Sequence, residues 1–133
     1  MKKLLFSLIL FGVCFVNAQL TITTNMREDG TWDKAKEDWI ITSTTKGLTV
    51  LNFNKEFTSF RHITDEISSE YEILDWDYDE KEILYEMKLK SDAGNEYDFM
   101  IDGINEYLIF FYYDDAKNYR MVRHTMSDSV FKE

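Results

Sequence analysis

The fold class is decided by residues 71–101, which read YEILDWDYDEKEILYEMKLKSDAGNEYDFMI. Apolar and polar side chains alternate here in three runs, Tyr71 to Tyr78, Ile83 to Lys90 and Glu96 to Ile101. Successive side chains of an extended strand point to opposite faces, so the alternation predicts strands with one apolar and one charged face. Short polar segments separate the runs, which predicts that neighbouring strands are antiparallel.

The same pattern continues outward in both directions. We expect further strands at Leu20 to Thr24, Trp39 to Thr45, Leu48 to Phe53, Phe57 to Thr64, Glu106 to Tyr113 and Tyr119 to His124. The prediction is an all-β, single-domain antiparallel up-and-down meander of eight or nine strands, either a small barrel or a two-sheet sandwich.

The expected connections are short. Asp102-Gly103 is the strongest hairpin signal, because a type I′ turn requires positive φ at both central residues. Lys46-Gly47, Asn54-Lys55 and Ala93 to Asn95 also predict turns, and Asp114 to Asn118 predicts a longer polar loop.

Two segments do not fit the strand pattern. Gly30 to Asp38 leads into Trp39 and has Trp32, Ala35 and Trp39 at spacings of three and four residues, which predicts a turn or two of helix. Asp65 to Glu70 predicts a loop or a short helical turn.

The first 18 residues have the pattern of an export signal. Lys2 and Lys3 precede an apolar run from Leu4 to Val16, and Ala18 ends the segment. The 13 residues of this run are too few to cross a bilayer, which takes roughly 20. We therefore predict a cleaved signal peptide at 1–18, a single β domain at 19–133, and a periplasmic or secreted protein without stable membrane insertion.

Charge and cysteine content exclude several functions. Loss of Lys2 and Lys3 changes the formal net charge from −10 to −12, which disfavours nucleic acid and anionic lipid. The only cysteine, Cys14, lies in the predicted signal, so the remaining chain cannot use thiol chemistry. We expect a cationic partner, such as a basic protein, a peptide or a metal ion, although the same charge also serves solubility.

Four carboxylates have the spacing of a calcium-binding loop. Asp75, Asp77, Asp79 and Glu86 match positions 1, 3, 5 and 12 of an EF-hand, but Glu80 replaces the glycine that makes its sharp turn. A strand with an acidic outer face explains the same residues. We therefore predict no metal site and keep these four carboxylates as weak candidates.

No catalytic signature is present in the sequence. It contains no Gly-x-Ser-x-Gly elbow and no phosphate-binding glycine loop, so we predict no catalytic residue and no cofactor. A zinc site at His62 or His124 would need further ligands such as Asp65 or Glu66, and exposed positions on strands are the simpler expectation. A metal-dependent or hydrolytic enzyme requires that two of His62, His124, Asp75 and Glu86 converge in a cleft.

The run Tyr107 to Tyr113 is apolar without alternation. Such a strand is covered on both faces, or its outer face meets a ligand or a partner. The leading hypothesis is a non-enzymatic exported binding or protein-interaction module. Its candidate ligand or partner surface comprises Trp76, Tyr85, Phe99, Tyr107, Phe110 and Tyr112.

Gly30-Thr31-Trp32 resembles the Gly-x-Trp element that opens the first strand of lipocalins. The resemblance implies an exported eight-stranded barrel that binds a small apolar ligand. In this alternative, Trp76, Tyr85, Phe99 and Phe110 line an internal pocket.

Overall fold

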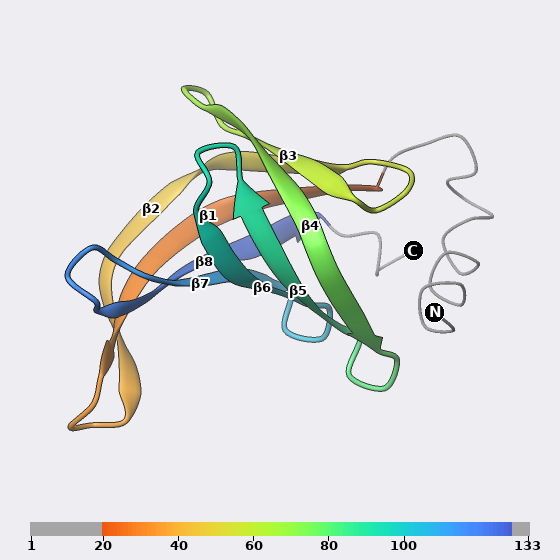
Figure 1. Ribbon diagram of the computed structural model, residues 1–133. Coiled ribbons are helices and arrows are strands. Elements are labelled where there is room, and N and C mark those ends of the chain that lie inside the picture. The colour runs from red at the N-terminus through yellow and green to blue at the C-terminus, as the bar shows by residue number, and fades with distance from the viewer. Residues whose placement is uncertain (1–19, 129–133) are drawn as a thin grey trace.

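A computed structural model describes residues 20–128 as a closed antiparallel barrel of eight strands (Figure 1). Each strand pairs with the next in the chain, and the last strand pairs with the first. The predicted meander is therefore confirmed, with eight strands and barrel closure. The strands are β1 (Leu20–Asp33), β2 (Asp38–Phe53), β3 (Ser59–Ile63), β4 (Ser68–Asp79), β5 (Leu84–Ser91), β6 (Glu96–Asp102), β7 (Tyr107–Tyr113) and β8 (Tyr119–Asp128). The predicted signal peptide lies outside the described residues.

The long hairpin of β1 and β2 corrects two predictions. Gly30 to Asp38 forms the end of β1, a turn and the first residue of β2, and it contains no helix. Trp32 and Trp39 face each other across this hairpin with ring centroids 5.3 Å apart. Lys46-Gly47 is not a turn either, because it lies inside β2 where the register with β1 shifts.

The turn after β6 forms where the sequence predicts it, but by another mechanism. Asp102 Oδ1 accepts hydrogen bonds from the backbone N–H groups of Ile104 and Asn105, and Glu106 has φ of 64°. Gly103 is needed for close approach rather than for positive φ. A Cβ atom at this position would lie 2.4 Å from Ile83 Cγ2.

Aromatic rings fill the barrel interior. Phe99 and Phe110 have centroids 4.5 Å apart, and Phe60 lies 5.5 Å from Phe99. Phe57, from the loop after β2, is buried in the core, and its ring centroid lies 4.9 Å from that of Trp76. Burial of so many large rings provides the apolar area that a domain without disulfides needs.

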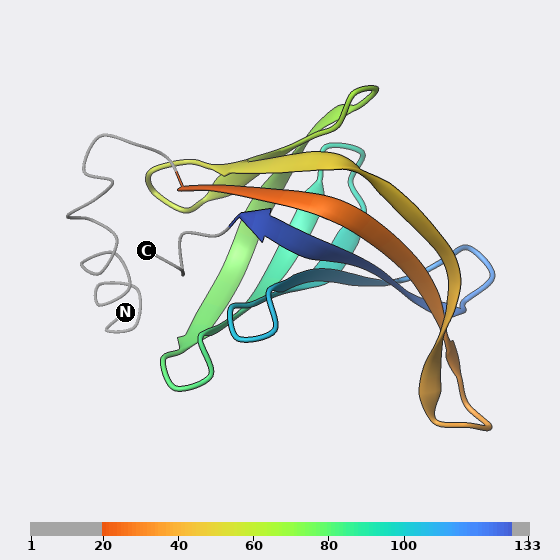
Figure 2. The ribbon, with the colours of Figure 1, turned by 180° about the vertical axis from the view of Figure 1, so that it is seen from behind.

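The barrel wall is uneven because β3 is only five residues long. It pairs with β2 only over Val50–Phe53, so residues 40–48 of β2 extend past it and are exposed. Figures 1 and 2 show the β1–β2 hairpin extending away from the barrel. Trp39, near its tip, packs against Phe111 and Tyr119 of β7 and β8. Trp39 therefore covers part of the outer face at Phe111 and Tyr119, although the hairpin tip projects away from the barrel.

Candidate functional site

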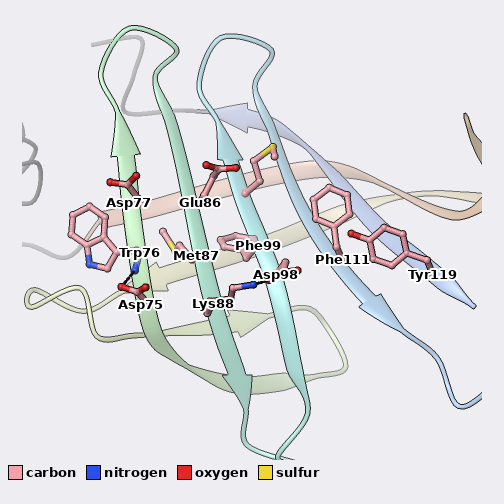
Figure 3. A pocket seen from close by; sticks show the side chains of 11 residues that line it. Asp75, Trp76, Asp77, Glu86, Met87, Lys88, Asp98, Phe99, Phe111 and Tyr119 are labelled. Carbon is pink, nitrogen blue, oxygen red and sulfur yellow. Dashed lines mark hydrogen bonds and ion pairs between the residues drawn. The ribbon is translucent and has the colours of Figure 1, made fainter. Parts of the chain in front are cut away.

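A groove of about 440 Å³ lies over the outer face of β4, β5, β6 and β7, with Tyr119 of β8 at one end (Figure 3). Its acidic side chains lie toward one end, and two aromatic rings lie side by side at the other. Met87 and Phe99 belong to the core below. The outward-facing lining residues are Asp75, Asp77, Glu86, Lys88, Asp98, Met100, Phe111 and Tyr119.

The strand register explains why these residues meet. Asp75 pairs with Lys88, Lys88 pairs with Asp98, and Asp98 pairs with Phe111, so one row crosses four strands. Residues paired directly across a sheet share a face. Lys88 forms an ion pair with Asp98, which leaves the row with the formal charge of Asp75.

The neighbouring row has an excess of negative charge. Asp77 and Glu86 are directly opposite each other on β4 and β5, and Met100 follows on β6. Like charges at directly opposite positions of a sheet repel each other. A bound cation would offset that repulsion.

Neutralising this pair is therefore expected to stabilise the free protein. We expect Glu86→Gln to raise the free energy of unfolding by about 0.2–1 kcal/mol. Urea unfolding measures this change. Asp98→Asn is the matched control, and it should not stabilise the protein because it breaks the ion pair with Lys88. Equal destabilisation by both variants would contradict the proposed repulsion.

The aromatic end of the groove is held by packing outside the barrel. Phe111 and Tyr119 stack with centroids 6.1 Å apart, and Trp39 lies 5.3 Å from Tyr119. A second groove of about 240 Å³ shares Phe111 and Tyr119 and includes Tyr113. The groove therefore has carboxylates at one end and aromatic rings at the other, an arrangement that suits a cation with an apolar stem.

The structure separates the residues that the sequence grouped as one surface. Tyr85, Phe99 and Phe110 are at most 5% exposed, so they do not form an exposed partner surface, although Phe99 is among the residues that line the larger groove. They face inward because alternate side chains along a strand point to the same face, and their neighbours two residues away belong to the core. Trp76, predicted as a site residue, is partly buried against the core and also lines the larger groove (Figure 3).

The two remaining members of that group lie apart from each other. Tyr112 packs against the core and contacts Tyr97, with ring centroids 5.6 Å apart. Tyr107 lies under the guanidinium of Arg123, whose Cζ is 4.7 Å from the ring centroid. Neither residue borders the larger groove.

The run Tyr107 to Tyr113 alternates in its environment even though its sequence does not. Leu108 and Phe110 are buried in the core, whereas Phe111 faces outward and is covered in part by Trp39. Phe111, Tyr119 and Met100 are not among the site residues predicted from the sequence. The alternation of side chains along β6 could have identified Phe111, because Asp98 marks the outer face of β6 and pairs with Phe111 on β7.

The four carboxylates with the spacing of a calcium-binding loop lie on two strands joined by a turn. Asp75, Asp77 and Asp79 lie on β4, and Glu86 lies on β5. Asp79 Oδ1 accepts hydrogen bonds from the N–H groups of Lys81 and Glu82 and so caps the turn. Within residues 20–128, no group of three or more histidine, cysteine or carboxylate side chains is arranged to hold a metal ion.

The histidines differ from the expectation that both are exposed. His124 is 2% exposed, and His62 is half-buried with its ring centroid 5.8 Å from that of His124. Burial lowers the pKa of His124 to about 4, and the positive charges of His62 and Arg27 act in the same direction. Burial and Arg27 also lower the pKa of His62. Asp65 and Glu66 are exposed in the loop after β3.

The two histidines converge, but not in either groove described above. Asp75 and Glu86 lie on the outer face of the barrel, and neither histidine borders the grooves. Of the four residues named for an enzyme, His62 and His124 therefore lie close together, and Asp75 and Glu86 share the acidic groove.

Comparison with known proteins found no matching family model, no matching curated protein and no matching solved structure. The part of the chain that the structure describes has no helix long and apolar enough to cross a membrane. Gly30-Thr31-Trp32, the element that resembles lipocalins, lies toward the end of β1. Trp32 lies near the tip of the β1–β2 hairpin, against Trp39.

Proposed function

We propose that the protein is an exported, non-enzymatic binding module that recognises a basic protein or peptide through the acidic groove on β4–β7. The observation that carries the proposal is the directly opposed pair Asp77 and Glu86 inside a groove that ends at Phe111 and Tyr119. A lysine or arginine side chain would offset the repulsion between the carboxylates and place its apolar stem against the rings.

Long-range electrostatics support the same partner. The formal net charge of −12 after the predicted cleavage attracts cations and increases their rate of encounter. Screening by salt weakens this attraction, so affinity for a basic peptide should fall as ionic strength rises.

The packing of the interior favours a surface site over an internal pocket for an apolar ligand. Phe60, Phe99 and Phe110 contact one another in the space where such a ligand would lie. Saturable quenching of tryptophan fluorescence by a fatty-acid probe would favour the internal pocket instead.

The test compares two variants that remove the same number of charges. Hexa-arginine is titrated by calorimetry into the wild type, Asp77→Asn/Glu86→Gln and the control Asp65→Asn/Glu66→Gln. We expect the groove variant to bind about tenfold more weakly, a loss of about 1.4 kcal/mol, because it removes the carboxylates that meet the peptide. The control should bind within about threefold of the wild type, since its changes lie in an exposed loop.

Equal weakening in both variants would show that the peptide responds only to net charge, and the groove would be discarded. Binding of hexa-arginine that is unchanged in the groove variant would contradict the proposal in the same way.

A further inference from the structure

The buried polar side chains of residues 20–128 lie together. They are Thr24, Thr49 and His124, each at most 6% exposed. Thr24 and Thr49 pair across β1 and β2, and Thr24 Oγ1 lies 3.5 Å from Nδ1 of His124. Burying polar groups is costly unless they are well satisfied, and this contact is at the outer limit of a hydrogen bond.

His62 adds a second imidazole from across the barrel. It lies on β3, whereas His124 lies on β8, and these strands are not neighbours in the sheet. Both rings contact Phe110 at the edge of the aromatic core, with centroid distances of 6.2 and 6.1 Å. The pair therefore spans the interior at the boundary of the core.

The separation of the two rings suits a shared metal ion. A metal lies about 2 Å from each ligating nitrogen and so about 3 Å from each imidazole centre. Two such centres are about 5–6 Å apart when the angle at the metal is tetrahedral or somewhat wider. The observed separation is 5.8 Å, with the ring planes inclined at 65°.

The surroundings of the pair also favour a metal. With Nδ1 of His124 facing the hydroxyl of Thr24, its Nε2 is the nitrogen left to bind, and a hydrogen bond from the other ring nitrogen is usual for metal-ligating histidines. Burial lowers the pKa of both histidines, which favours the neutral imidazole that binds metals.

The charge of Arg27 opposes a cation at this position. Its guanidinium is engaged by Asp29 through two hydrogen bonds of 2.9 and 3.2 Å, which offsets that charge. Because no third side-chain ligand is arranged at the pair in the described chain, solvent would complete the coordination. Micromolar rather than nanomolar affinity follows from so few protein ligands.

We propose that His62 and His124 together bind one divalent transition-metal ion of the kind that prefers imidazole, Cu²⁺ or Zn²⁺. This site is separate from the acidic groove, which neither histidine lines. Imidazole ligands select such metals over Ca²⁺ and Mg²⁺, which prefer oxygen.

The test uses protein freed of metal with a chelator and titrated by calorimetry with ZnCl₂ and with CuCl₂. We expect one ion per chain, and at least a tenfold loss of affinity in His62→Asn. This variant changes the more exposed histidine, and its circular dichroism spectrum is to be compared with that of the wild type to check that it folds. Asp77→Asn/Glu86→Gln is the control and should bind as the wild type does, which separates this site from the groove.

Electron paramagnetic resonance of the Cu²⁺ complex provides a second readout that does not depend on a variant. We expect hyperfine coupling to two imidazole nitrogens in the wild type and to fewer in His62→Asn. Unchanged affinity in His62→Asn, absence of binding at millimolar metal, or a spectrum without imidazole nitrogens would each overturn the proposal.

Discussion

Phe110→Ala is expected to destabilise the barrel by about 3–5 kcal/mol, the usual loss for a fully buried ring. Phe110 is 5% exposed, and it contacts Phe60, Tyr71 and Phe99. Rings held by strands on several sides cannot move to close the space that the substitution leaves. Urea unfolding followed by circular dichroism measures the loss.

Phe111→Ala is the matched control, because the next residue in the chain faces the opposite side of β7. We expect a smaller loss of stability, below about 2 kcal/mol, together with weaker binding of hexa-arginine. Binding should be unaffected in Phe110→Ala under conditions where it remains folded. A loss below about 1 kcal/mol for Phe110→Ala would contradict a filled interior.

Acidification is expected to destabilise the protein through His124. The folded-state pKa of about 4 lies below the ordinary value of 6.5. Above pH 6.5 the imidazole of His124 is neutral in both the folded and the unfolded protein, and its contribution to the free energy of unfolding is fully present. As the pH falls from 6.5 to 4, only the unfolded chain takes up the proton, so about 3 kcal/mol of stability is lost in this window.

The groups facing His124 set the direction of this effect. Burial is the main cause, His62 and Arg27 reinforce it, and Asp29 opposes it. The free energy of unfolding is measured from pH 7.5 to 4 with a chelator present. In His124→Leu the free energy of unfolding should depend less steeply on pH than in the wild type, because the variant lacks this imidazole. Titration of carboxylates is common to both proteins and cancels in the comparison. Parallel profiles would show that His124 is not the responsible group.

The charged residues of the sequence were sufficient to predict β5, β6 and most of β4, but β4 begins at Ser68, inside the segment Asp65 to Glu70 that was wrongly predicted as a loop or a short helical turn. Asp75, Asp77 and Glu86 mark the outer face directly, so the alternation fixes both the strands and their orientation. Local periodicity carries this information because it depends only on neighbouring residues. The acidic half of the groove could have been predicted from it.

The aromatic half of the groove depends on pairing between strands. The run Tyr107 to Tyr113 has no polar residue to mark its outer face, and only its register with β6 shows that Phe111 lies beside Asp98. Trp32 and Trp39 are seven residues apart, which fits two turns of a helix as well as a cross-strand pair in a hairpin. Sequence spacing could not distinguish these alternatives.

The meeting of His62 and His124 depends on closure of the barrel. Their strands are not adjacent, so neither local alternation nor the pairing of neighbouring strands brings them together. The short β3 and the curvature of the sheet determine which residues meet across the interior. Contacts of this kind arise from the whole fold and have no local signal.

The central claim is that recognition occurs on the outer face of β4–β7 while the rings below exclude ligands. Amide chemical shifts of the labelled protein, recorded by NMR during titration with hexa-arginine, test it most directly. We predict saturable shifts concentrated at Asp77, Glu86, Asp98 and Phe111, with little change at Phe60 and Leu51 in the core. Shifts concentrated at core residues, or no saturable shifts at millimolar peptide, would contradict it.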